Sequence, residues 1–154
     1  MITEIQIEKQ SQSLENADFE GELKLLSHTH KMLHSYLMNE QLEMLNEDEY
    51  KILWFDGMVI IKCFEEARGY QIEDDPKMIE NLESKGWAML ENSKPAGFRE
   101  KLDVFFENTQ QEDLLAFVED SLADDDEMSI SSAAKEIIFI TLYTLIEYLD
   151  NPRD

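Results

Sequence analysis

The sequence predicts an all-α fold, a compact single domain over residues 1–154 built as a bundle of about six helices. Prolines and glycines are few, three and five respectively, and the helix-favouring residues Leu, Glu, Met and Lys are common. A chain of 154 residues is one domain's worth and can bury a core without disulfides or metals. We expect the bundle to form around a strongly hydrophobic, central C-terminal helix.

That helix is predicted from the run 133–149, AAKEIIFITLYTLIEYL, the most hydrophobic in the chain. After Glu136 its polar members are Thr141, Thr144 and Glu147, so apolar side chains cover nearly the whole circumference. Such a helix has to be buried on most sides. A membrane span is the alternative, but the uncharged stretch between Glu136 and Glu147 is about half of the roughly 20 residues that a bilayer requires. The run therefore predicts a core helix.

The N-terminal third predicts one long helix. Residues 1–12 carry a short pattern of Ile2, Ile5 and Ile7 that fits either an extended, loosely attached arm or a frayed helical start, so we leave them unassigned. From Ser13 or Asn16, either of which can cap, a helix is expected to continue to about Leu45. Its apolar positions are spaced alternately by about three and four residues. They are Phe19, Leu23, Leu26, His30, Leu33, Leu37 and Met44.

A second heavily buried helix is predicted after Asn46. Asn46 can cap this helix, and the three acidic residues that follow suit the positive end of the helix dipole. Gly69 stands where a left-handed residue commonly ends a helix. Gly57 in the interior costs about 1 kcal/mol relative to alanine, which indicates a close helix crossing or a bend.

Two further helices are predicted in the middle of the chain. Asp75 and Pro76 have the order of an N-cap and a first helical residue, and the helix is expected to end near Lys85 with Gly86 as its stop. Another helix should begin by residues 95–96. Its expected buried side chains are Phe98, Leu102, Phe105 and Phe106.

A fifth helix is predicted from Thr109 and Glu112, which have the spacing of a capping box. Residues 124–127 are expected to form a loop before the last helix, which begins at about Ser129. The apolar residues of the fifth helix are expected to be buried. They are Leu114, Leu115, Phe117, Val118 and Leu122.

The net charge is extreme, because 35 acidic residues against 13 basic ones give −22. Such a surface repels nucleic-acid phosphates and anionic lipids, so no direct nucleic-acid or membrane binding is expected, and it attracts basic proteins. The alternative is that the acidity serves only solubility or salt adaptation. Cys63 is the one cysteine and the first ten residues do not resemble a signal peptide, so we expect a cytoplasmic location.

The acidic residues are densest between Lys101 and Lys135, where ten carboxylates occur without a basic residue. Unneutralised like charges at this density destabilise the free protein, and a basic partner would relieve their repulsion. A solvated helix face is the alternative for any single cluster. The residues predicted to bind a partner are Asp113, Glu119, Asp120, Asp124, Asp125, Asp126 and Glu127.

Few residues suggest chemistry. His30 and His34 have a spacing that places two imidazoles on one helix face, but a metal site needs a third ligand, and neither Glu-x-x-His nor His-Glu-x-x-His occurs. Cys63 lies in an apolar run, unlike an activated thiol. No P-loop, Gly-x-Gly-x-x-Gly, kinase or hydrolase motif is present. We predict that the chain is not an enzyme and holds no cofactor or metal.

The sequence therefore favours a small acidic binding protein that inhibits or neutralises a basic partner, such as a nuclease, a toxin or a DNA-binding enzyme. Immunity proteins and nucleic-acid-mimicking inhibitors act in this way, because carboxylates on rigid helices can occupy phosphate sites. One alternative is an acidic helical chaperone or adaptor for a secreted or assembled client, which would expose an apolar groove. A second is a metal-dependent helical-bundle enzyme that uses His30 and His34.

Overall fold

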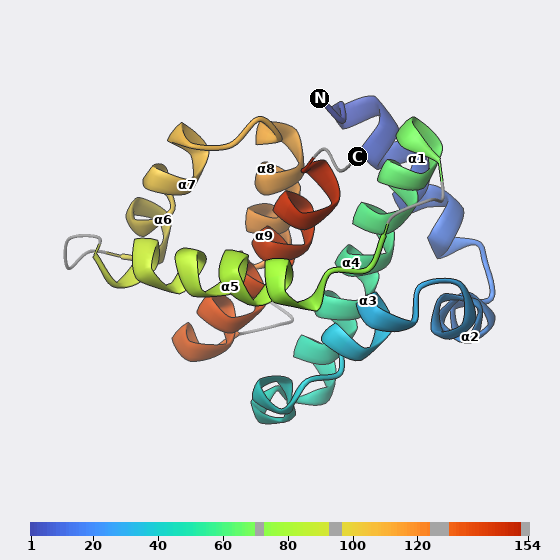
Figure 1. Cartoon of the computed structure of the whole chain (residues 1–154), viewed down its shortest axis with the longest axis horizontal. Coiled ribbons are helices and arrows are strands. Elements are labelled where there is room, and N and C mark those ends of the chain that lie inside the picture. Colours follow the sequence, from blue (N-terminus) through green and yellow to red (C-terminus); the bar gives the residue numbers. More distant parts are fainter. Residues whose placement is uncertain (70–72, 93–96, 124–129, 152–154) are drawn as a thin grey trace.

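Helix α9, Ser132–Asp150, is the element against which several other helices pack in the computed structural model (Figure 1). Twelve of its 19 residues are buried. Every regular element of the described ranges is a helix, and none of these helices combines the length and apolarity that a membrane crossing requires. The structure describes residues 1–69, 73–92, 97–123 and 130–151.

Helix α4, Glu47–Arg68, packs along α9 (Figure 1). Its start was predicted correctly: Asn46 Oδ1 accepts a hydrogen bond from the Glu49 N–H at 2.8 Å, and Glu49 Oε1 accepts one from the Asn46 N–H at 2.9 Å. Gly69 follows its last residue with φ 88°, in the left-handed region that favours glycine. These local signals fix both ends of the helix.

Gly57 marks a close approach to α4, as the sequence indicated. A Cβ atom at this position would lie 3.2 Å from Leu37 Cδ1 and 3.8 Å from Leu142 Cδ2 of α9. The absent side chain therefore lets two neighbouring segments approach the α4 backbone.

Helix α5, Pro76–Glu91, extends beyond the predicted end. Asp75 caps its first turn, as expected. Gly86 does not stop the helix but lies inside it, where a Cβ atom would be 3.5 Å from Ile140 and Tyr143 of α9. Packing against α9 compensates for the low helix propensity of glycine at this point.

Residues 4–15 form helix α1, Glu4–Glu15, rather than a loosely attached arm. Helix α1 packs on α4, and Ile2, Ile7 and Leu14 are buried. Ile7 and Leu14 are two helical turns apart, so they share one face of the helix. This pair is the helical signal in a segment that the sequence left unassigned.

The predicted long helix is wrong, because the chain is divided into α2 (Phe19–Thr29), α3 (Lys31–Tyr36) and a 3₁₀ segment η1 (Glu40–Met44). The break between α2 and α3 falls at His30, whose φ of −135° and ψ of 66° are not helical. The buried His30 Nε2 atom lies 2.9 Å from Glu65 Oε1 of α4. This tertiary pair provides a polar partner for the histidine at the break.

The fourth predicted helix consists of two short helices, α6 (Phe98–Lys101) and α7 (Asp103–Glu107). Its expected start at residues 95–96 lies outside the described residues. Leu102 joins the two helices and is fully buried, as is Phe105. The described ranges thus contain more and shorter helices than the six or so predicted.

Helix α8, Glu112–Ser121, follows at the predicted place but without the predicted capping box. The Thr109 hydroxyl donates to Glu147 Oε1 of α9 at 3.1 Å and accepts from the Gln111 N–H at 3.0 Å. A tertiary contact with α9 has therefore replaced the local cap. Four of the five apolar residues predicted to be buried are buried, whereas Phe117 is only partly buried.

The burial of α9 gives a stability prediction. Ile138→Ala and Leu142→Ala should each lower the free energy of unfolding by about 2–5 kcal/mol, because both side chains are fully buried and their removal leaves a cavity. Leu25→Ala is the matched control, since Leu25 is 54% exposed and should cost less than about 1 kcal/mol. Denaturant melts measure all three, and small losses for both α9 variants would contradict this account of the core.

Candidate functional site: an acidic groove between α1 and α8

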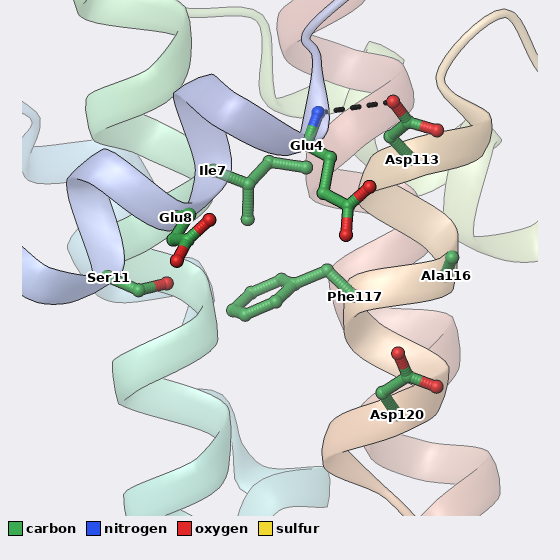
Figure 2. A pocket seen from close by; sticks show the side chains of 8 residues that line it. All are labelled: Glu4, Ile7, Glu8, Ser11, Asp113, Ala116, Phe117 and Asp120. Atoms are coloured by element: carbon green, nitrogen blue, oxygen red, sulfur yellow. Dashed lines mark hydrogen bonds between the residues drawn. The ribbon is translucent and has the colours of Figure 1, made fainter.

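A groove with a volume of about 470 Å³ lies between α1 and α8 (Figure 2). Each helix contributes positions spaced as i, i+3, i+4 and i+7, so each presents one face to the groove over two turns. The lining consists of Glu4, Ile7, Glu8 and Ser11 from α1 and Asp113, Ala116, Phe117 and Asp120 from α8.

The first turn of α1 is fixed by local and tertiary caps. Thr3 and Gln6 form a capping box, in which the Gln6 N–H donates to Thr3 Oγ1 at 3.3 Å and the Thr3 N–H donates to Gln6 Oε1 at 2.7 Å. The Glu4 N–H donates to Asp113 Oδ2 at 3.1 Å, the contact drawn in Figure 2. Asp113 thus supplies a carboxylate to the positive end of α1.

Gln111 connects the same region to the core. Its side chain is almost fully buried, its Oε1 accepts from the Ile2 N–H at 2.9 Å, and its Nε2 donates to Asp150 Oδ1 at 2.8 Å. Asp150 Oδ1 also accepts from Arg68 Nη2 at 2.7 Å. The α1 wall of the groove is therefore tied to α8 and, through α9, to α4.

Three carboxylates lie around an aromatic ring in the groove, and a fourth, that of Asp113, lies at the start of α1. Figure 2 shows the Phe117 ring reaching from α8 toward α1, with the Glu4 and Glu8 carboxylates on one side of it and Asp120 on the other. Among the described lining residues none is basic. Glu4 and Glu8 are one helical turn apart, and a like-charge pair at this spacing costs about 0.2–0.5 kcal/mol. The groove therefore combines an apolar surface with uncompensated negative charge.

The predicted partner-binding residues are only partly brought together. Asp113 and Asp120 line the groove, whereas Glu119 lies outside it and its Oε2 accepts from Arg99 Nη1 at 2.6 Å. Burial raises the pKa of Glu119 above its ordinary value, although Arg99 opposes this effect. Outside the described residues lie Asp124, Asp125, Asp126 and Glu127.

Of the eight lining residues, the sequence predicted only Asp113 and Asp120 as site residues. Glu4 and Glu8 were missed because no helix was assigned to their segment, although their one-turn spacing would place both on one helix face. Phe117 lies in an apolar run, so the sequence predicts it to be buried in the core. Asp113 precedes it by one turn and Asp120 follows it by nearly one turn, so acids on the same face of the helix were the available signal that this face is not core.

His30 and His34, the candidate metal ligands, contact side chains of α4, and Cys63 is buried within that helix. His30 Nε2 lies 2.9 Å from Glu65 Oε1, whereas the His34 ring lies 5.4 Å from the Trp54 ring, measured between centroids. Burial raises the pKa of the Cys63 thiol to about 12. Within the described ranges, no three His, Cys, Asp or Glu residues are placed to hold a metal ion. The two histidines contact different parts of α4, because their partners Glu65 and Trp54 are eleven residues apart on that helix.

Comparison with family models, with curated proteins and with solved structures finds no significant match to this chain. A functional proposal therefore depends on the groove, its charge and its geometry.

A buried carboxyl group lies at the contact between α4 and α8. Asp56 on α4 is 2% exposed, and its Oδ2 atom has no hydrogen-bond partner among the described residues. Burial raises the pKa of Asp56 to about 8, and a hydrogen bond with Ser121 of α8 opposes this only in part. Below about pH 8 the folded protein therefore holds Asp56 in its neutral form.

This burial predicts a pH-dependent stability. An unfolded aspartate has a pKa of about 3.9, so between about pH 4 and 8 the folded state keeps a proton that the unfolded state releases. The free energy of unfolding therefore falls as the pH rises above about 4. This one group lowers it by at most about 1.4 kcal/mol per pH unit. Asp56→Asn should remove this loss. In melts, the variant and the wild type should differ little near pH 4 and the variant should be more stable at pH 8; equal pH profiles would contradict the assignment.

The net charge predicts a salt effect on stability. Raising the ionic strength from low to physiological values should raise the denaturation midpoint, because repulsion among carboxylates is screened over a Debye length of about 8–10 Å. Sodium chloride titrations of the thermal midpoint measure the effect. A midpoint that falls with salt would mean that attractive ion pairs dominate the surface.

Proposed function

We propose that this chain is a small acidic binding protein that neutralises a basic partner protein by covering the partner's basic surface. A nuclease, a toxin or a DNA-binding enzyme has such a surface, because it must attract phosphates. The chain would act by binding rather than by catalysis, in the cytoplasm, as immunity proteins and nucleic-acid mimics do. The groove between α1 and α8 is the observation that carries this proposal.

The distribution of ion pairs supports the proposal. Several basic side chains are already paired with acids outside the groove. Examples are the Lys9 pair with Glu66 at 2.8 Å and the Lys62 pair with Glu22 at 2.9 Å. Among the described residues no groove carboxylate takes part in an ion pair, so the field of these carboxylates acts on the solvent and on any approaching cation.

The composition of the groove favours a basic partner over an apolar client. Half of its eight lining positions carry a carboxylate, whereas a chaperone that grips its client by apolar contacts needs a largely apolar groove. The exposed large apolar side chains of the described ranges belong to different parts of the chain. They are Met1 and Ile5 near the start of α1, Leu25 on α2, and Met38 and Met44 beside η1.

Binding kinetics test the proposal. The partner is captured from the native host, identified by its mass and produced separately. Reversing Glu8 and Asp120 to lysine should slow association at least roughly ten-fold at low salt, because steering depends on the summed field, and the difference should shrink at physiological salt. Dissociation should change less, since exposed charges act mainly on the association rate.

The matched control carries the same change in charge on another helix. Glu80 and Glu91 are exposed residues of α5, which packs on α9. Reversing both to lysine should slow association clearly less than reversing Glu8 and Asp120. Equal association rates for the two double variants would show that the groove is not part of the interface and that only the total charge affects association.

A further inference from the structure

Arg68 shows how this chain holds a guanidinium group. Its Cζ atom lies 5.1 Å from the centroid of the Phe64 ring, and its Nη2 donates to Asp150 Oδ1 at 2.7 Å. The aromatic face attracts the cation and the carboxylate accepts its hydrogen bond.

Arg99 repeats the arrangement at another place in the fold. Its Cζ atom lies 5.8 Å from the centroid of the Phe106 ring, while its Nη1 donates to Glu119 Oε2 at 2.6 Å. In both cases a phenylalanine and a carboxylate together hold one arginine. The pair of examples defines a ring-and-carboxylate site for a guanidinium group.

The groove contains the same components without an arginine of its own. Phe117 is partly buried, so part of its ring is accessible, and Glu4, Glu8 and Asp120 are exposed on the same groove. Figure 2 shows the Glu4 and Glu8 carboxylates directed into the space beside the Phe117 ring. None of the described lining residues is basic, so no guanidinium group of the described ranges lines this space, and an arginine from a partner could enter it.

We propose that the groove between α1 and α8 binds an arginine side chain of the basic partner, with the guanidinium group against Phe117 and its hydrogen bonds directed to Glu4 and Glu8. This inference rests on the proposed function and specifies the residue that the partner inserts. The groove extends over two turns of each helix, so the partly buried Ala116 offers apolar contact to a residue beside that arginine.

Arginine suits this site better than lysine. A guanidinium group is planar, so it can stack on the ring while its five N–H donors reach two carboxylates at once. A lysine ammonium is a compact and strongly hydrated charge that satisfies one acceptor at a time more readily than two separated ones. The preference for arginine is therefore a property that general attraction between opposite charges would not produce.

Two short acetylated and amidated peptides test the inference, identical except that one carries arginine wherever the other carries lysine. Because their charges are equal, binding of the lysine peptide reports general attraction, and the difference between the peptides reports the ring-and-carboxylate site. In ¹H–¹⁵N titrations we expect the amides of α1 and α8 to shift. We expect the arginine peptide to bind roughly two- to five-fold more tightly.

Matched variants assign the preference to its residues. Phe117→Leu keeps the charge and most of the apolar surface and should abolish the preference for arginine. Phe106→Leu is its control, because that ring already holds Arg99, and it should keep the preference. Glu8 is exposed, so Glu8→Gln should leave the fold intact. It should weaken binding of the arginine peptide more than Glu15→Gln on the same helix.

The inference is overturned by equal affinities for the two peptides, by a preference that survives in Phe117→Leu, or by shifts that lie only outside α1 and α8. Equal but salt-sensitive affinities would leave the proposed function standing, since general attraction would remain. Absence of saturable binding by either peptide would also overturn the inference. The proposed function fails separately, if charge reversal in the groove does not slow association with the captured partner.

Discussion

The burial of α9, in which every residue from Ile138 to Leu149 except Glu147 is buried, is the constraint on which the rest of the structure depends. Thr141 and Thr144 are buried polar residues of this helix. Their hydroxyls donate to the backbone carbonyls of Ile137 and Ile140 at 2.8 and 2.7 Å. Because these groups are satisfied within the helix, neither requires contact with water. Other helices, α8 among them, can therefore cover α9 on several sides, while α1 packs on α4 and α8. The carboxylates of the groove lie on the outer surfaces of α1 and α8.

The end of α9 also positions the groove. Asp150 binds Gln111 and Arg68, and Gln111 in turn holds the backbone of Ile2, so the start of α1 is fixed relative to α8. Asp113 completes this connection through the Glu4 N–H. Its carboxylate therefore has a structural role at the edge of the groove, and the remaining groove carboxylates are the better candidates for contact with a partner.

Local signals predicted the elements that local interactions determine. Asn46 caps α4 as expected. The predicted start of the last helix, about Ser129, lies outside the described residues, and α9 begins after Ser131, whose hydroxyl accepts from the Ala134 N–H. The predictions were wrong where contacts with a distant segment determine the local structure. The predicted long helix is broken at His30, beside its partner on α4, and α5 continues through Gly86 because this residue packs on α9. Two of the residues predicted to bind a partner, Asp113 and Asp120, line the groove on α8. The groove itself was not predicted, because nothing in the sequence specifies that α1 lies opposite α8.

Arg68 and Arg99 show which stabilising contacts the groove carboxylates lack in the free protein. Where the chain holds its own arginines, at Arg68 and Arg99, each carboxylate gains a charge-assisted hydrogen bond and each ring gains a cation. Glu4 and Glu8 face one another's charge beside Phe117 without this compensation. Their repulsion is small against the stability of a domain, so the fold tolerates it. A partner's arginine would relieve it in the complex only, and the same pair of carboxylates that weakens the free protein would then strengthen the bound one.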